Sequence, residues 1–544
     1  MSKSDHKQSL VLQAGILAAA GIVVRIIGLL YNTPLVHIIG DEGFGYYDSA
    51  YAAYSIILMV SSFSIPSAVS KVMAQKLAME EYKNAYRLFK CTLIYVIVVG
   101  LVAAAVIFFG AGVLVKMESA VLPLKILAPT VFLCGILGAF RGFFQAQHSM
   151  VQTSLSQIIE QIFNAGFSVL MAYVLVQYAQ GMSSSKIASF GAAGSTIGTG
   201  VGVLSALCFM LIIYFYNRKS FMAKVNSDVH PVESYKSIFK MILLVVTPFI
   251  LSTCVYNVNS FMDKTIYQVV LMGKRSLPES AVAFDLSAYA KANKIANIPI
   301  ALSAAMAATL IPRLSTYITQ KNYTVARNQV DKAIRVTMFI SIPSAVLVGV
   351  LAKPIMMVIF PQKDSLEAAS FTLIILALTV ILYALSTITQ AVLQAIGKLK
   401  LPIVNGVVSL AIHAILLVGA LYFLPTEYAL YSYGIATVLY ALILCVLNGI
   451  CVARHLDYHQ EMDKTFVRPV ICSVLMGGVS FGVYQLLYTL TGINILALAV
   501  SLCVALVVYL VLVLRWKAIS EEELLSIPKG GRILSIAQKM RIVR

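Results

Sequence analysis

The chain has 544 residues, of which 60% are hydrophobic and only 12% are charged, and its formal net charge is +18. Soluble domains carry about a quarter charged residues and somewhat under half apolar residues, so this composition excludes one soluble core as the fold. The basic excess is a weak indication of nucleic-acid binding, because its distribution along the chain favours a membrane topology signal and attraction to anionic lipid.

The first apolar stretch covers residues 10–39, after Lys3 and Lys7. It is longer than the apolar region of a signal peptide and is interrupted by Arg25, so we expect a retained first helix. The eight cysteines of the chain lie in apolar stretches and show no CxxC spacing. We therefore expect free thiols, with no disulfide framework and no zinc site.

Apolar runs long enough to cross a bilayer core of about 30 Å recur from the first stretch almost to the C-terminus. They predict an all-α polytopic membrane protein of about fourteen transmembrane helices. The expected spans are 10–39, 46–78, 90–114, 120–147, 150–178, 190–216, 238–270, 282–312, 332–352, 366–396, 401–424, 429–453, 467–490 and 493–515.

Lysine and arginine residues are concentrated in alternate connecting segments, notably 71–90, 218–240, 313–335 and the C-terminal tail. Since such residues accumulate on the cytoplasmic side, both termini are predicted to be cytoplasmic. A miscounted helix would scramble this alternation, so the pattern supports the span count as well. Residues 530–544 alternate apolar and basic side chains, and we expect them to form a short helix on the inner membrane surface.

An internal repeat relates the two halves. Residues 49–52 and 287–290 both read Ser-Ala-Tyr-Ala, and several pairs in the span 120–147 recur in the span 366–396 at one common offset. Both matches join helices six spans apart, which predicts two six-helix lobes related by an axis along the membrane normal, followed by two extra helices. The expected boundaries are 1–222 for the first lobe, 223–237 for a cytoplasmic linker, 238–455 for the second lobe, 456–515 for the extra helices and 516–544 for a basic tail.

Ionisable residues at membrane depth are costly and indicate function by default. Arg25 lies near the middle of the first span, and Gly21, Arg25, Gly28 and Asn32 share one helical face. Small residues beside a long cation leave room for a ligand, so we predict ligand contact for Arg25 and Asn32. Alternatively, Arg25 is a buried structural partner of Glu160 or Asp263.

The span 282–312 is polar along its first half, where Lys291, Lys294 and Asn297 lie, and Pro299 follows as an expected kink. Such a face cannot meet lipid, so it should line a wet cavity. Two lysines without an adjacent acid suit an anionic ligand. The alternative, snorkelling toward the outer surface, fits Lys291 better than the deeper Lys294.

Polar side chains also recur at helical spacing in three other spans, and they include Tyr51, Glu160, Asn259 and Asp263. Together these faces predict one central cavity, in which tyrosines of the second span stack on sugar. Alternatively, the tyrosines form an interfacial belt and the other groups make scattered helix–helix hydrogen bonds.

Motifs for other chemistries are missing. Asn405 and Ser409, four residues apart, are only weak candidates for a cation site. No Walker A loop is present, because Gly397-Lys398 and Gly273-Lys274 lack the required flanking residues. There is also no HExxH, no GxSxG and no acidic metal cluster. We therefore expect a transporter rather than an enzyme.

Three segments resemble one family. Residues 23–54 (VVRIIGLLYNTPLVHIIGDEGFGYYDSAYAAY) and 141–164 (RGFFQAQHSMVQTSLSQIIEQIFN) resemble polysaccharide-biosynthesis transporters of the MATE-like (MOP) superfamily. Residues 289–315 (YAKANKIANIPIALSAAMAATLIPRLS) resemble the eighth helix of MurJ-type lipid II flippases and of the stage V sporulation protein B group. The resemblance covers nearly the whole chain.

The resemblance implies two lobes, a central cationic cavity, alternating access, and an undecaprenyl-pyrophosphate-linked saccharide as cargo. It places Arg25 and Lys294 at basic positions of family helices 1 and 8. The chain departs from the family pattern at Tyr31, where other members carry a second arginine, and it lacks the basic residue of family helix 2. Lys291 is a candidate replacement, and relatives carry a sodium site for which a carboxylate beside Asn405 is missing here.

The leading prediction is a flippase that moves lipid II from the inner to the outer leaflet, with Arg25, Lys291 and Lys294 holding the pyrophosphate. Alternatives are a flippase for another polysaccharide or spore-cortex precursor, and a cation-coupled multidrug exporter of the same superfamily. A membrane-bound glycosyltransferase or polymerase would need a large outer loop, which this chain lacks.

For partners we predict the lipid-linked saccharide and anionic membrane lipids, with no nucleic acid. We expect a monomer in the bacterial cytoplasmic membrane, associated in one interpretation with cell-wall synthesis proteins. No cofactor is predicted, and transport is expected to be coupled to a sodium ion, a proton or the membrane potential.

Overall fold

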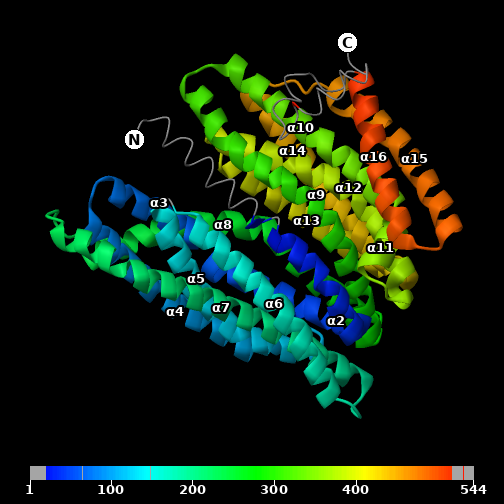
Figure 1. The fold of residues 1–544 in the computed structure, drawn as a ribbon, viewed down its shortest axis with the longest axis horizontal. Coiled ribbons are helices and arrows are strands. Elements are labelled where there is room, and N and C mark those ends of the chain that lie inside the picture. The colour runs from blue at the N-terminus through cyan, green and yellow to red at the C-terminus, as the bar shows by residue number, and fades with distance from the viewer. Residues whose placement is uncertain (1–19, 22, 64, 148, 517–530, 532–544) are drawn as a thin grey trace. The chain divides into compact units, whose positions relative to one another are not determined.

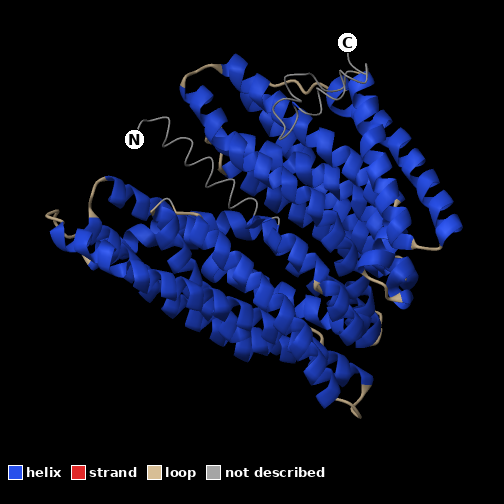
Figure 2. Ribbon diagram, in the orientation of Figure 1, coloured by secondary structure: helices blue, strands red, loops and turns tan. Residues whose placement is uncertain are grey.

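The computed structural model describes residues 20–21, 23–63, 65–147, 149–516 and 531. All regular secondary structure among these residues is helical (Figure 2). Residues 10–19 and 22 of the expected first span and, apart from Gly531, the expected surface helix at 530–544 lie outside the described residues. The chain divides into two compact units, Met1–Ser287 and Ala288–Arg544, and each is described by itself.

The first unit contains helices α2 to α8 and the first turns of α9, which are coloured from blue to green in Figure 1. Its membrane helices follow the expected spans closely, except that α4, α7 and the second end of α9 extend further toward the connecting segments. Their bounds are α2 Asn32–Leu58, α3 Ile65–Ala78, α4 Tyr82–Leu114, α5 Val121–Ala146, α6 Val151–Tyr178, α7 Ser184–Ser227, α8 Tyr235–Gln268 and α9 Glu279–Thr319. A short π-helical segment, Met59–Phe63, precedes α3.

A sharp break interrupts α2 at Gly40, whose φ of 69° and ψ of −179° lie outside the helical region. A side chain would be strained in this conformation, which glycine adopts freely. The expected boundary between the first two spans, at residues 39–46, falls at this break. The first span therefore ends at Ile39 and the second begins directly after Gly40.

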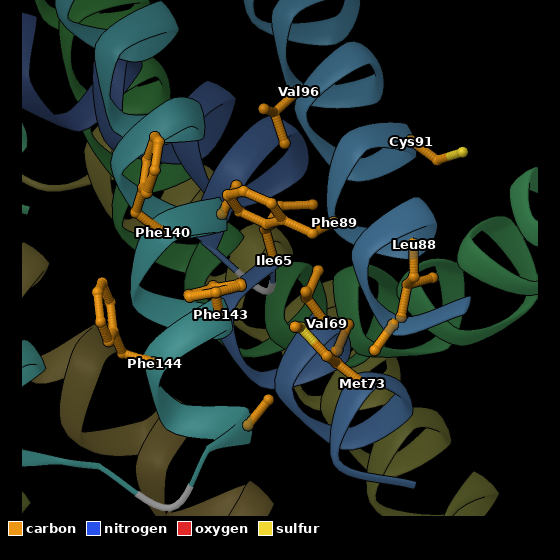
Figure 3. Close-up of a cluster of buried hydrophobic side chains, with 14 of the residues drawn as sticks. Ile65, Val69, Met73, Leu88, Phe89, Cys91, Val96, Phe140, Phe143 and Phe144 are labelled. Atoms are coloured by element: carbon orange, nitrogen blue, oxygen red, sulfur yellow. The ribbon is translucent and has the colours of Figure 1, made fainter. Parts of the chain in front are cut away.

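The core of the first unit is an aromatic and aliphatic cluster between α3, α4, α5 and α7 (Figure 3). The ring of Phe89 lies 5.4 Å from that of Phe140 and 4.7 Å from that of Phe143. On the opposite side of α4, large apolar side chains such as Phe109 and Val113 are largely exposed. This distribution fits a helix that buries one face in protein and presents the other to lipid.

Helices α6 and α7 pack with their backbones unusually close. A Cβ atom added to Gly194 would lie 2.4 Å from the Met171 carbonyl oxygen, and one on Gly198 would lie 2.2 Å from the Ser168 nitrogen. Small residues at such an interface allow close van der Waals contact, which drives helix association in a membrane.

The second unit contains the rest of α9 and helices α10 to α16. Its main core joins α9, α10, α12 and α14, and the last two helices pair with each other beside α10 and α11. The bounds are α10 Tyr323–Val350, α11 Ala352–Ile359, α12 Lys363–Ala395, α13 Lys400–Phe423, α14 Ala429–Leu456, α15 Arg468–Thr491 and α16 Asn494–Arg515.

The same helix pairs pack together in both halves of the chain. In the first unit α4 contacts α5, α5 contacts α7, and α6 contacts α7. The helices six spans later repeat the pattern, since α10 contacts α12, α12 contacts α14, and α13 contacts α14. This recurrence agrees with the sequence repeat and with an all-α fold of two related bundles.

Eleven helices of the described residues are long and apolar enough to cross a membrane. They correspond to expected spans 2–6 and 9–14, while α8 and α9 occupy expected spans 7 and 8. The structure is thus compatible with fourteen spans. The boundary between the compact units lies within α9, so α8 belongs to the first unit. The sequence repeat instead places α8 at the start of the second lobe. The predicted lobe boundaries stay a prediction.

Candidate functional site

Arg25 lies in the helical residues 23–30 and is exposed. Among the residues described in the first unit, its guanidinium forms no ion pair or hydrogen bond, so the alternative in which it pairs with Glu160 or Asp263 is not what this conformation shows. One turn later, a Cβ on Gly28 would lie 3.2 Å from the Gln161 side-chain nitrogen. The structure therefore brings Gln161 of α6, the residue after Glu160, to the face that carries Arg25.

Asn32, predicted on the same face, is buried, and its side-chain nitrogen donates to the Gly28 carbonyl oxygen. In this conformation it satisfies a backbone carbonyl of the helical residues 23–30, one turn before α2 begins. Ligand contact by Asn32 stays a prediction.

Four tyrosines form a ladder at the start of the first unit. The hydroxyls of Tyr31 and Tyr47 lie 3.5 Å apart, the rings of Tyr47 and Tyr51 stack at 5.8 Å, and Tyr51 lies 5.5 Å from Tyr54. Tyr54 in turn contacts the Cys134 sulfur on α5 at 3.5 Å. Tyr51 is 40% exposed although both of its ring neighbours are buried, so it is the member of the ladder that can offer a ring face to a sugar.

Glu160 forms an ion pair with Arg141, whose guanidinium nitrogen lies 2.6 Å from the carboxylate and whose Nε donates to Ser156 at 2.9 Å. The pair joins α5 to α6 and neutralises Glu160. Sequence reasoning assigned Arg141 to a connecting segment and missed this partnership. The sequence indicates the pair only by position: Arg141 lies near the end of one expected span, and Glu160 lies near the start of the next.

Two further ionisable residues of the first unit, Asp263 and Lys264 on α8, are also engaged. With its amide oriented to donate, Asn259 lies 3.2 Å and 3.3 Å from the two carboxylate oxygens of Asp263. The Lys264 ammonium lies 2.6 Å from the carboxylate of Asp48 on α2. These groups hold α8 together and bind it to α2. Ser252 and Tyr256 precede Asn259 and Asp263 at helical spacing, and their side chains lie outside the described residues.

The second unit holds the two lysines of α9. Lys291 is completely buried, with 0% exposure, and its ammonium donates to the Ser365 hydroxyl at 2.8 Å and the Gln362 amide oxygen at 3.4 Å, both at the start of α12. Burial of this kind is inconsistent with snorkelling to the membrane surface in this conformation. The bonds instead attach α9 to α12.

Lys294, one turn deeper, is half-buried. Asn297 is exposed and donates to the carbonyl oxygen of Asn293 at 2.9 Å. Of the three predicted ligand contacts on α9, Asn297 is therefore exposed, Lys294 is half-buried and Lys291 is enclosed. The hydrogen-bond partners of Lys291 on α12 had no signature in the sequence.

The weak cation-site candidates are bonded to their own surroundings. Asn405 donates to Asn448 of α14 at 2.9 Å, and Ser409 donates to the Asn405 carbonyl oxygen at 2.7 Å. His413, one turn further on the same face, is buried with Nδ1 2.8 Å from the Ala436 carbonyl oxygen. Within the described ranges, no group of three or more histidine, cysteine or acidic side chains could hold a metal ion.

Comparison with known proteins adds to this geometry. The family model described as "Lipid II flippase MurJ" matches residues 81–502. The lipid II flippase MurJ of Bacillus subtilis (strain 168) is 23% identical over 480 residues, covering 84% of this chain and 85% of that protein. Stage V sporulation protein B of the same organism is 22% identical over 548 residues, covering 97% of this chain and 99% of that protein.

Solved structures show the same fold. A lipid II flippase MurJ in an inward closed conformation aligns with a TM-score of 0.66 at 15% identity, covering 91% of this chain and 97% of that one. An inward-facing multidrug resistance transporter of the MATE family aligns with a TM-score of 0.59 at 13% identity, covering 80% of this chain and 98% of that one. At these identities the likeness concerns the fold alone.

Proposed function

Because this chain belongs to the lipid II flippase MurJ family, we propose that it moves an undecaprenyl-pyrophosphate-linked saccharide, lipid II, from the inner to the outer leaflet of the bacterial cytoplasmic membrane. The observation that carries the proposal is the placement of cations inside membrane helices. Arg25 lies fifteen residues before the break at Gly40, and Lys294 lies fifteen residues after the start of α9 at Glu279.

At 1.5 Å per residue, both cations lie about 22 Å along their helices from the expected outer ends, well inside a core of about 30 Å. A pyrophosphate cannot cross that core without compensation for its negative charge, and cations in a low-dielectric environment reduce this cost. Arginine suits the task because its fork of donors matches phosphate oxygens, and lysine serves as a point charge.

Contacts at the expected outer end support transport by alternating access. Asp48 pairs with Lys264, Ser49 accepts from Gln268 at 3.0 Å, and Ser287 donates to Asp41 at 3.0 Å. These bonds tie α2 to α8 and to the start of α9. Release of cargo to the outer leaflet would require them to break, so they are the contacts that a transport cycle would exchange.

The nature of the cations also bears on the alternatives. A cation-coupled drug exporter of the same superfamily would need an acidic, aromatic binding site for its positively charged substrates. Arg25, Lys291 and Lys294 give the predicted binding residues the opposite charge. The fold likeness to the MATE transporter does not separate the two functions, since it carries no information about the cargo. Coupling to an ion or to the membrane potential, cytoplasmic termini and a monomeric state stay predictions.

The proposal is tested by complementation of a strain depleted of its own lipid II flippase. Arg25→Ala and Lys294→Ala should each reduce transport about tenfold or more, because a hydrogen bond to a charged group contributes about 1.5–3 kcal/mol. Arg25→Lys and Lys294→Arg should restore part of the activity. Lys398→Ala, at an exposed position of a connecting segment, is the matched control and should complement fully.

Full complementation by both alanine variants at normal expression would show that these cations do not carry the cargo. If the protein complemented only a strain that lacks the flippase of a different lipid-linked saccharide, the cargo would be that saccharide. If drug sensitivity were the sole phenotype of a strain in which the gene is deleted, the drug exporter would be favoured.

A further inference from the structure

The segment between α7 and α8, residues 228–234, is bound through Asp228, Pro231 and Glu233 to the α3–α4 turn, by which we mean the end of α3 and the first turns of α4. We call residues 228–234 the strap. The sequence predicts this region only as a polar cytoplasmic linker. In the structure it lies within the first unit and leads directly into α8, whose first turn is capped by the Ser234 hydroxyl.

The strap begins with a helix cap for α4. The Asp228 carboxylate accepts from the Lys83 backbone N–H at 2.7 Å and from the His230 backbone N–H at 2.8 Å. The first N–H groups of a helix lack partners within it and favour a negative charge. The bond from the Lys83 N–H is the largest cause that lowers the pKa of Asp228, and the bond from the His230 N–H adds to it, so that the pKa is about 2. The carboxylate therefore stays charged at physiological pH.

Both the nitrogen and the oxygen of the Asn84 side chain bind backbone groups of the strap. Its side-chain nitrogen donates to the Pro231 carbonyl oxygen at 3.0 Å, and its oxygen accepts from the Glu233 N–H at 2.9 Å. Asn84 is only 3% exposed. If the strap left, the Asn84 nitrogen would keep its bond to the Glu81 carboxylate at 3.0 Å, but its buried oxygen would lose the Glu233 N–H, and two backbone groups of the strap would lose their partner.

Two cations complete the attachment. Arg87 donates to the Glu233 carbonyl oxygen at 2.6 Å and lies 4.4 Å from the ring centre of Tyr235, the first residue of α8. Lys76, at the end of α3, pairs with the carboxylates of both Glu81 and Glu233. Three helix ends, those of α3, α4 and α8, are therefore joined through one short segment.

The outer end of α8 is attached differently. There α8 contributes side chains to its bonds with α2: the Lys264 ammonium pairs with the Asp48 carboxylate and lies 3.4 Å from the Asp48 carbonyl oxygen, and the Gln268 amide donates to Ser49. Side-chain pairs can exchange partners when helices shift, whereas a bound backbone and a capped helix end must be replaced as a unit.

We propose that the strap stays bound to the α3–α4 turn throughout the transport cycle, so that the inner end of α8 is a fixed pivot about which its outer end swings away from α2. The pivot rests on the proposed function only in assuming that a transport cycle exists. In this proposal the strap fixes the position of the inner end of α8 and does more than connect two helices.

Cross-linking separates the two ends. In a variant whose eight native cysteines are replaced, Lys83→Cys with Val229→Cys places thiols beside the strap on side chains that take no part in its bonds, Val229 being largely exposed. Ser49→Cys with Gln268→Cys places them at the outer end. A short, reducible bis-methanethiosulfonate reagent should link both pairs, and translocation of lipid-linked saccharide is then measured in proteoliposomes.

The inner cross-link should leave at least half of the transport rate, while the outer cross-link should lower it at least tenfold until a reductant is added. Inhibition by the inner cross-link that a reductant reverses would overturn the pivot, and so would failure of the inner pair to react. A reduced protein that moves no lipid-linked saccharide at all would instead defeat the proposed function.

Amide hydrogen exchange tests the pivot without reference to cargo. The Lys83 and Glu233 amides should exchange at least tenfold more slowly in the unmodified protein than in the double variant Asn84→Ala, Asp228→Asn. Lys264→Met, which releases the outer end, should leave these two rates unchanged. Fast exchange in the unmodified protein, or acceleration by Lys264→Met, would contradict a strap that stays bound.

Discussion

Two segments of the repeat, residues 45–52 and 283–290, share the sequence Ser-Ala-Tyr-Ala but lie in different surroundings. Gly45 and Ala283 precede the shared tetrapeptide by the same number of residues, and they lie against each other: a Cβ on Gly45 would be 2.0 Å from the Ala283 carbonyl oxygen. Contact between equivalent positions is expected where a pseudo-two-fold axis passes between the repeats.

Beyond that contact the copies differ. Tyr51 stacks within the tyrosine ladder and is 40% exposed, whereas Tyr289 is 5% exposed, stacks on Tyr433 at 3.9 Å and bonds to Thr437 at 2.9 Å. The repeat thus sets where the helices run, and the neighbours of each copy decide whether its tyrosine is a structural ring or one that can meet a ligand.

The largest effect is expected at the shared contact. Gly45→Ala would place a methyl group against a backbone oxygen that no side-chain rotation can move, so we expect a loss of more than about 3 kcal/mol of stability or a shift of α2 relative to the start of α9. Thermal unfolding in detergent measures it. Gly478→Ala, where an added Cβ meets no atom within 4 Å, is the control and should unfold as the natural protein does.

The tyrosines should give opposite phenotypes. Tyr289→Leu removes a buried ring and its hydrogen bond, which should cost about 2–3 kcal/mol. Tyr51→Leu should leave the unfolding midpoint nearly unchanged and reduce transport, because its ring is exposed. Parallel measurement of unfolding and complementation decides, and equal destabilisation by both substitutions would mean that the two copies play the same structural role.

The serines of the two copies provide the finest distinction. Ser287 donates to the charged Asp41, while Ser49 bonds to the neutral Gln268. Bonds to charged groups contribute about 1.5–3 kcal/mol and neutral ones about 0.5–1.5 kcal/mol, so Ser287→Ala should destabilise the protein more than Ser49→Ala. Denaturant titration of the two single variants would refute the distinction if their order were reversed.

Much of the fold follows from the sequence because a bilayer imposes a length and an apolar composition on every span. The ends of α12 to α16 agree with the expected spans within a few residues. Helices α4 and α7 run further than expected, since their polar ends continue the helix beyond the apolar run that marks a span. A hydropathy pattern marks only the apolar part of a helix and therefore does not predict such an extension.

The candidate site was less predictable. The sequence located the ionisable groups, but their partners depend on which helices meet. The Arg141–Glu160 pair and the bonds of Lys291 to α12 join residues whose spacing shows no pattern. The attachment of the strap was missed for the same reason. Asn84 binds backbone groups of a segment almost 150 residues away, and a pattern of side chains carries no information about such bonds.

The most direct test of the central claim is translocation of fluorescent lipid II by the purified protein in proteoliposomes of bacterial lipid. The account predicts transport that depends on the protein and falls about tenfold or more in Arg25→Ala and Lys294→Ala, while Lys398→Ala retains the full rate. Equal rates for the natural protein and both alanine variants would contradict the assignment of these cations to the pyrophosphate, and an absence of lipid II movement by folded protein would contradict the proposed cargo itself.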